Sequence, residues 1–324
     1  MNRPKTAANP DFDLQDGVLK PPTSKSNQYY EAICELGLEP HIAELDAVGY
    51  TVVPPEKVAP PQFLARIRDA VQRISGERRG VQFSAEKNPD LNVSNGVPNS
   101  VYEFYLLFED AVFEEWLENE TLGALVDYAM LGQAQLSSMS SVLKWNGGTF
   151  GPSLGLHSDS PGSPEGRLPM DYNAICNGAL CLSDYTREGG AIAMVPGSHR
   201  LGRQPKAGEG VESAVPVEAP AGSLVFWVAN TWHGAFPREI DGLRMTITNF
   251  FCHRAFKTQE NYQTAVPDDM LARHSARFAR FLGADDFMGW AKEGPGPGGA
   301  RVATYRERTG EAGAEHNVGA IDSE

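Results

Sequence analysis

The stretch SLVFWVANTWHGAFPREIDGLRMTITNFF, residues 223–251, decides the interpretation of this chain. It holds two apolar runs separated by a segment rich in turn-forming residues, which is the pattern of a strand, a turn and a strand. On the second run Arg244, Thr246 and Thr248 alternate with apolar residues, so one face of this strand carries an arginine and two hydroxyls. If the two runs pair as a hairpin, His233 and Arg244 lie near one another on the same face.

Similar short apolar runs fill the chain after about residue 133, where they alternate with Gly, Pro, Asn and Ser turns. Short strands at regular spacing predict an all-β barrel or sandwich. Helical periodicity dominates the part before residue 133 and returns after the last run. The expected strands are 49–54, 140–145, 174–185, 191–197, 223–230 and 243–251. The expected helices are 29–38, 40–50, 61–75, one or two within 101–131, and 268–291.

These patterns divide the chain into three parts. Residues 1–26 are polar and rich in Pro, Asn and Ser, which predicts a disordered segment. Residues 27–292 are expected to form a single domain, and 293–324 a Gly-rich tail. Within the domain we expect a helical part, a barrel core and C-terminal helices, at 27–132, 133–256 and 257–292.

Composition excludes several classes of partner. The chain has 28 Lys and Arg against 42 Asp and Glu, and this acidic balance argues against a nucleic-acid or anionic-membrane partner. No apolar run approaches the roughly 20 residues of a membrane helix. The first residues contain no apolar signal region, and the four cysteines form no CxxC pair. We therefore expect a cytoplasmic protein, a monomer or homo-oligomer, that binds a small-molecule substrate.

A second motif lies in LGLHSDSP, residues 154–161, where His157 and Asp159 stand two positions apart. On a strand, residues i and i+2 point to the same face. With His233, they would supply the two histidines and one carboxylate that hold one face of a non-heme iron and leave three positions open. An α-keto acid could take two of these positions and O2 the third, with Arg244 on the far carboxylate.

The chain resembles the phytanoyl-CoA dioxygenase (PhyH) family of Fe(II)/2-oxoglutarate-dependent oxygenases. The resemblance covers roughly residues 135–255 and implies a double-stranded β-helix, a cupin-like jelly-roll barrel. It rests on four pieces in order: HSD at 157–159, GGAIAMVPGSHR at 189–200, AGSLVFWVANTWHGAF at 221–236, and Arg244 eleven positions after His233.

The resemblance also implies roles for single residues. His157, Asp159 and His233 would bind the catalytic iron, and Arg244 the distal carboxylate of 2-oxoglutarate. Many members carry a Ser or Thr two positions after the second histidine, where this chain has Ala235.

A helper hydroxyl must therefore come from elsewhere, with Thr246 as the candidate, or be absent. Lys144 and Asn146 lie where relatives place further contacts to the cosubstrate, and we expect them to bind it. Residues 160–172 follow two of the implied ligands and form either a lid or a solvated connection.

The implied activity is that of a dioxygenase, an oxidoreductase that uses Fe(II), 2-oxoglutarate and O2. It would hydroxylate or otherwise oxidise an unactivated C–H bond of a small organic metabolite, with release of succinate and CO2. Two alternatives stay open: a cupin-like metalloenzyme that does not use 2-oxoglutarate, and a non-catalytic barrel that binds a ligand.

Overall fold

A computed structural model describes residues 25–93, 97–161, 166–168 and 173–284, together with four two-residue strands outside these ranges. The expectations for residues 1–26 and 293–324 therefore lie largely outside the described residues. The four short strands pair two by two: β1 (Leu14–Gln15) with β2 (Val18–Leu19), and β12 (Trp290–Ala291) with β13 (Gly294–Pro295).

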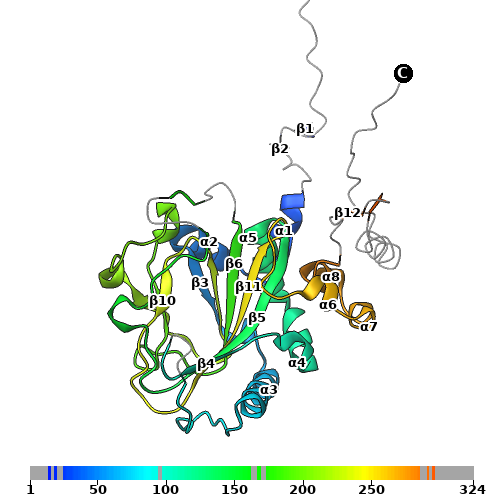
Figure 1. Ribbon diagram of the computed structural model, residues 1–324. Coiled ribbons are helices and arrows are strands. Elements are labelled where there is room, and N and C mark those ends of the chain that lie inside the picture. The colour runs from blue at the N-terminus through cyan, green and yellow to red at the C-terminus, as the bar shows by residue number, and fades with distance from the viewer. Residues whose placement is uncertain are drawn as a thin grey trace, which may run out of the picture.

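Two antiparallel sheets form the centre of the molecule (Figure 1). The larger sheet has six strands, in the order β3 (Tyr50–Val53), β9 (Leu224–Val228), β6 (Ile175–Cys181), β11 (Arg244–His253), β5 (Ala134–Lys144) and β4 (Ser100–Glu103). The smaller sheet has three strands, in the order β10 (His233–Ala235), β7 (Ile192–Met194) and β8 (Val215–Pro216).

The predicted fold class, mainly β with flanking helices in a jelly-roll arrangement, is confirmed. The two sheets face one another, and no ladder of hydrogen bonds closes the described strands into a complete barrel. The expected strands at 49–54, 174–185, 191–197 and 223–230 are all present, with shorter bounds.

Helices lie on the outer side of the larger sheet, and Figure 1 shows α4, α6, α7 and α8 on the side away from β10. No helix in the described part of the chain is both long enough and apolar enough to cross a bilayer. The helices are α1 (Lys25–Glu35), α2 (Glu39–Val48), α3 (Pro61–Arg79), α4 (Ala111–Leu117), α5 (Glu120–Met130), α6 (Tyr262–Ala265), α7 (Asp268–Ala272) and α8 (Ala276–Phe281). Short 3-10 turns lie at Pro55–Lys57, Leu106–Phe108, Gly151–Ser153, Ser198–Leu201 and Val211–Ser213.

Strand alternation separates the helix side of the larger sheet from its inner side. Leu180, Phe226 and Ile247 point outward and are fully buried in one cluster with the helices. Each such side chain contributes roughly 1.5–3 kcal/mol by leaving water. The inner face carries small, polar and apolar residues, among them Ala179, Thr246 and Trp227, which pack toward the smaller sheet.

The hairpin expected between residues 223–230 and 243–251 is wrong. After β9 the chain crosses to the smaller sheet, where β10 pairs with β7, and then returns to the larger sheet, where β11 lies between β5 and β6. The connection is pinned by the buried Arg238, which donates to the carbonyls of Asp241 and Gly242 at 2.7 and 2.9 Å. His233 and Arg244 therefore belong to opposite sheets.

Two further expectations need correction. Residues 100–103, at the edge of a region expected to be helical, form strand β4 beside β5. The helix expected over 268–291 consists of the short helices α7 and α8, and residues 290–291 belong to strand β12 instead. Within 101–131 the chain forms two α-helices, α4 and α5, because the Asn119 side chain accepts from the Leu122 amide and begins α5 there.

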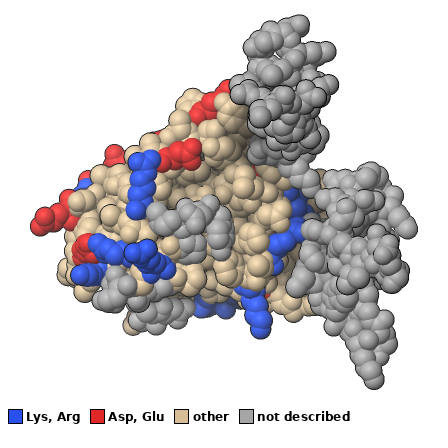
Figure 2. Space-filling model, turned by 90° about the horizontal axis from the view of Figure 1, so that it is seen from above, with Lys and Arg blue, Asp and Glu red and all other residues tan. Residues whose placement is uncertain are grey.

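Charged side chains on the surface are mixed rather than segregated. On the face in Figure 2, the Lys and Arg residues stand in separate small groups among acidic and uncharged ones.

Candidate metal centre

Three predicted ligands meet at one point between the sheets. The ligand atoms of His157, Asp159 and His233 all lie within 4.8 Å of one another. Nε2 of His157 is 3.5 Å from Asp159 Oδ1, and Nε2 of His233 is 3.3 Å from Asp159 Oδ2. Each oxygen of the one carboxylate thus faces one imidazole. The two rings lie side by side, with centroids 4.4 Å apart.

The backbone brings these residues together through a single bridge rather than a regular strand. The amides of His157 and His233 each donate to the carbonyl of the other at 2.9 Å. The Asp159 amide donates to the Ala229 carbonyl at 3.0 Å. Gly234 permits this approach, because a Cβ there would lie 2.1 Å from the Leu154 carbonyl oxygen.

Hydrogen bonds fix the tautomer of both histidines. Nδ1 of His157 lies 2.7 Å from the Gly155 carbonyl, and Nδ1 of His233 lies 3.0 Å from the Thr231 carbonyl. A carbonyl oxygen only accepts, so both Nδ1 atoms carry the hydrogen and both Nε2 atoms present lone pairs. Lone pairs that face a carboxylate repel it unless a proton or a cation lies between them. The three donors therefore fit a divalent metal ion.

Burial and neighbouring charges shift the pKa values of the three predicted ligands to different extents. Burial raises the pKa of Asp159, but the nearby His233 and His157 outweigh it and hold this pKa below its usual value. Burial lowers the pKa of His157, but the hydrogen bond and charge of Asp159 raise it overall. For His233 burial prevails, and its pKa is lowered. The two side chains differ in access, since that of His157 is 52% exposed and that of His233 only 9%.

Sequence reasoning missed the residues that orient the aspartate and its loop. Asn177, on the inner face of β6, donates from Nδ2 to Asp159 Oδ2 at 2.7 Å. The Gln204 side chain accepts from the Ser158 amide at 2.8 Å and donates to the carbonyls of Ser158 and Ser160 at 2.7 Å. The available signal was Asn177 itself, a lone amide within the otherwise apolar run ICNGALC.

Three buried basic side chains lie in the larger sheet and in the connection that leads to it from β10. Lys144, Arg238 and Arg244 are 2–6% exposed, and none of them forms a salt bridge with a described residue. Arg244 donates from Nη1 to the Gly190 carbonyl at 3.0 Å, while its Nε has no partner. Lys144 donates to the Phe236 carbonyl at 2.8 Å. We call these three residues the cation cluster.

Burial and mutual repulsion outweigh the one nearby carboxylate, Asp241, and lower the pKa of two members of the cation cluster. Burial, with the charges of Arg244 and Arg238, lowers the pKa of Lys144 to about 6. Burial, with the charge of Arg244, lowers the pKa of Arg238 to about 10. A dianion placed among these groups would restore the balance.

Of the other residues predicted to bind 2-oxoglutarate, the structure places only some near Arg244. Lys144 and Arg244 are direct partners in the register of β5 and β11. Thr246 follows on the same face, but its hydroxyl donates to the Leu180 carbonyl at 3.0 Å. Asn146 does not join this group, because its amide donates to Asp241 at 3.0 Å in the surface loops. The cosubstrate role expected for Asn146 is therefore not retained.

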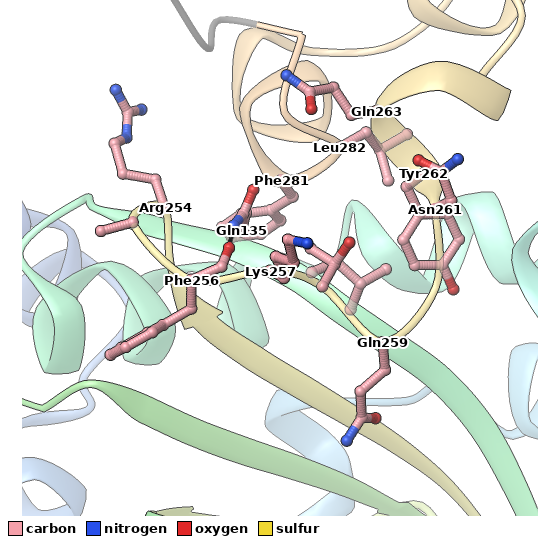
Figure 3. A pocket seen from close by; sticks show the side chains of 13 residues that line it. Gln135, Arg254, Phe256, Lys257, Gln259, Asn261, Tyr262, Gln263, Phe281 and Leu282 are labelled. Carbon is pink, nitrogen blue, oxygen red and sulfur yellow. Dashed lines mark hydrogen bonds between the residues drawn. The ribbon is translucent and has the colours of Figure 1, made fainter. Parts of the chain in front are cut away.

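Two other regions bear on the site less directly. Residues 162–165 and 169–172 lie outside the described residues, and with them the expectation of a lid at 160–172. A separate pocket of about 370 Å³ lies at the far end of the larger sheet, where the segment 254–263 meets α8 (Figure 3). The residues that line it include none of the three predicted ligands.

Two histidines and one carboxylate that meet between two facing sheets match the facial triad of the non-heme Fe(II) oxygenases. The sequence profile of the family "Phytanoyl-CoA dioxygenase (PhyH)" matches residues 45–246, which is more than half of the chain. The chain therefore belongs to the phytanoyl-CoA dioxygenase family, and the recognition made from the sequence is confirmed.

Relatives and solved structures agree with this class. The chain is 28% identical over 250 residues to the uncharacterized protein Rv1501 of Mycobacterium tuberculosis, covering 74% of this chain and 84% of that protein. It is 28% identical over 256 residues to dioxygenase af480 of Aspergillus fumigatus, covering 76% and 77%. HygX from Streptomyces hygroscopicus, solved with nickel and 2-oxoglutarate bound, superposes with a TM-score of 0.53 at 16% identity, covering 71% of this chain and 92% of that one. This last likeness shows the fold.

Proposed function

We propose that this protein oxidises a C–H bond of a small organic metabolite, with Fe(II) held by His157, Asp159 and His233 and with 2-oxoglutarate as cosubstrate. The observation that carries the proposal is the fixed tautomer of both histidines, which turns two Nε2 lone pairs toward the same carboxylate. The iron, when bound, supplies the activation of O2 that is coupled to conversion of 2-oxoglutarate to succinate and CO2. The protein residues bind, orient and shield the reactants.

The cation cluster supports 2-oxoglutarate as the cosubstrate. Arg244 is a buried, permanently charged group with an unpartnered Nε, which suits one carboxylate of a dicarboxylic acid. Lys144 adds a second positive group beside it when protonated. The other end of the same molecule would carry the keto acid toward the metal ligands. Proteins of this fold include HygX, solved with 2-oxoglutarate bound, and the α-ketoglutarate dependent carbocyclase SnoK.

The substrate has a place on the inner face of β11. Although β11 is hydrogen-bonded to strands on both sides, Thr248 and Phe250 stay partly exposed. Their neighbours in the register include Ser140 and Ser138 of β5. A wall of one aromatic ring and several hydroxyls suits a largely uncharged molecule with a few polar groups. The structure of HygX with hygromycin B bound shows that this fold admits a small-molecule substrate.

The test needs no primary substrate. Fe(II) and 2-oxoglutarate are added to metal-free protein without oxygen, and the visible charge-transfer band of a chelated keto acid is recorded. We expect the band with the wild-type protein. We expect no band with His233→Ala, and with Arg244→Ala a band that needs much more 2-oxoglutarate. The surface variant Arg66→Ala is the matched control for removal of an arginine, because Arg66 pairs with Glu115 in solvent.

The outcomes separate the alternatives. Iron binding without the band would refute the use of 2-oxoglutarate and favour a cupin-like metalloenzyme. Absence of iron binding would refute the metal centre and favour a non-catalytic binding protein. If the band appears, release of succinate becomes the assay with which candidate substrates are screened.

A further inference from the structure

Tyr185 is a buried phenol with no hydrogen-bond partner. It lies in the connection between β6 and β7, where its backbone pairs with Ala219 at 2.8 and 3.1 Å. Its side chain is 1% exposed, and its hydroxyl satisfies no hydrogen-bond geometry with any described residue. The Cys181 thiol and the Thr246 hydroxyl lie close enough to shift the pKa of Tyr185, but neither meets the distance and angle of a hydrogen bond to its hydroxyl. A buried hydroxyl in this state costs free energy and calls for an explanation.

The same place holds a second unsatisfied donor. The Arg244 guanidinium carbon lies 5.2 Å from the centroid of the Tyr185 ring, and Arg244 Nε is also buried without a partner. Burial raises the pKa of Tyr185 well above its usual value, so the phenol keeps its proton at neutral pH and is available as a donor. Two adjacent donors without an acceptor, beside the positive charge of the cation cluster, suit a carboxylate with its two oxygens.

We propose that Tyr185 donates a hydrogen bond to the distal carboxylate of 2-oxoglutarate and so acts with Arg244 as the second donor of this subsite. The inference rests on the proposed function. It answers the question that Ala235 raises, since that position offers no hydroxyl. It also assigns the role to Tyr185 rather than Thr246, whose hydrogen is used on the Leu180 carbonyl.

The variant Tyr185→Phe isolates the hydroxyl, because the ring that packs under Arg244 is retained. Titration of 2-oxoglutarate into the anaerobic Fe(II) protein, read by the charge-transfer band, compares three proteins: wild type, Tyr185→Phe and Thr246→Val. We expect Tyr185→Phe to weaken 2-oxoglutarate binding by about tenfold to a hundredfold, as for loss of a hydrogen bond to a charged group. We expect the position of the band at saturation to be unchanged and Thr246→Val to bind within about threefold of wild type.

Glutarate provides a second measurement of the distal carboxylate site, because it has no keto acid group. It competes with 2-oxoglutarate through the distal carboxylate, so Tyr185→Phe should weaken glutarate by the same factor. A general distortion of the metal centre would instead move the band and leave the glutarate affinity unchanged.

Each result has one meaning. If the wild-type protein does not bind 2-oxoglutarate, the proposed function fails and this inference fails with it. If the wild type binds and Tyr185→Phe matches it, the inference alone is overturned. Should Tyr185→Phe not fold, the wild-type protein with 13C-labelled tyrosine decides: a shift of the Tyr185 Cζ resonance on addition of glutarate is expected, and an unmoved resonance refutes the inference.

Discussion

Asn177 makes one contact that matters for the metal, a 2.7 Å hydrogen bond from its amide to Asp159 Oδ2. This bond fixes the direction of the carboxylate, and loss of such an orienting partner typically costs about 10–100-fold in metal affinity. We predict that Asn177→Ala weakens Fe(II) or Co(II) binding by about this factor, measured by titration of the metal-free protein. Asn88→Ala is the matched control, since Asn88 donates to Asp241 at 2.8 Å in the surface loops. Equal affinities of the two variants would contradict the role of Asn177.

Lys144 shows the cost of burying several basic side chains together. Its pKa is about 6 in the folded protein against an ordinary 10.5, so between these values the unfolded chain binds a proton that the folded chain does not. The free energy of unfolding therefore rises with pH across this window, by up to about 1.4 kcal/mol per pH unit.

Lys144→Met removes this dependence. We predict that the metal-free variant gains stability over wild type near pH 6.5, and that this advantage shrinks toward pH 9.5. Urea unfolding at both pH values measures it, with the exposed Lys257→Met as the control. A difference in stability that does not change with pH would contradict the assignment.

At the scale of elements, one group of charged side chains connects α4 to the segment between α7 and α8. Glu114 of α4 accepts from Arg273 at 2.8 Å and pairs with His274 at 2.6 Å, where α7 is followed by α8. Burial raises the pKa of Glu114, but the hydrogen bonds from Arg273 and His274 outweigh it and hold the pKa below its ordinary 4.5. A carboxylate whose pKa is lower in the folded than in the unfolded protein stabilises the fold at pH values above the unfolded pKa. This contribution is lost as the pH falls through the folded pKa.

We predict that Glu114→Gln lowers the free energy of unfolding by roughly 1–3 kcal/mol at pH 7. The difference should diminish as the pH falls below 4.5, because the unfolded wild-type chain then binds a proton at Glu114 that the folded protein resists. Denaturant unfolding at pH 7 and below pH 4.5 measures both effects. Glu115→Gln, which alters the exposed pair with Arg66, should change little. An equal loss of unfolding free energy in Glu114→Gln and Glu115→Gln would contradict a stabilising role for the buried Glu114 carboxylate.

At the scale of the whole molecule, the sequence predicted every strand of the larger sheet except β4, and three of the residues that meet at the metal centre. These features depend on alternation and on motif spacing, which are local in the chain. The crossing from β9 to the smaller sheet could not be predicted, because a hairpin and a crossover need the same apolar runs and the same turn residues. What distinguishes them is the buried Arg238, and the sequence does not show that its partners are the carbonyls of its own turn.

Long-range partners were missed for a similar reason. Asn177 lies 18 positions from Asp159, and Tyr185 lies 59 positions before Arg244. Neither pair has a spacing that marks it in the sequence. Asn146 was placed near the cosubstrate by its position after Lys144, but it stands beyond the end of β5, where the chain has already left the inner face.

The placement of His233 and Arg244 on opposite sheets has a mechanical consequence. A metal ion on one sheet and an arginine on the other would be joined by one five-carbon acid, so the loaded cosubstrate acts as a removable cross-link between the two halves of the jelly roll. Every turnover would cut that cross-link by shortening it to succinate. Amide hydrogen exchange in β7 and β10 would therefore slow when 2-oxoglutarate is bound and recover once succinate has left.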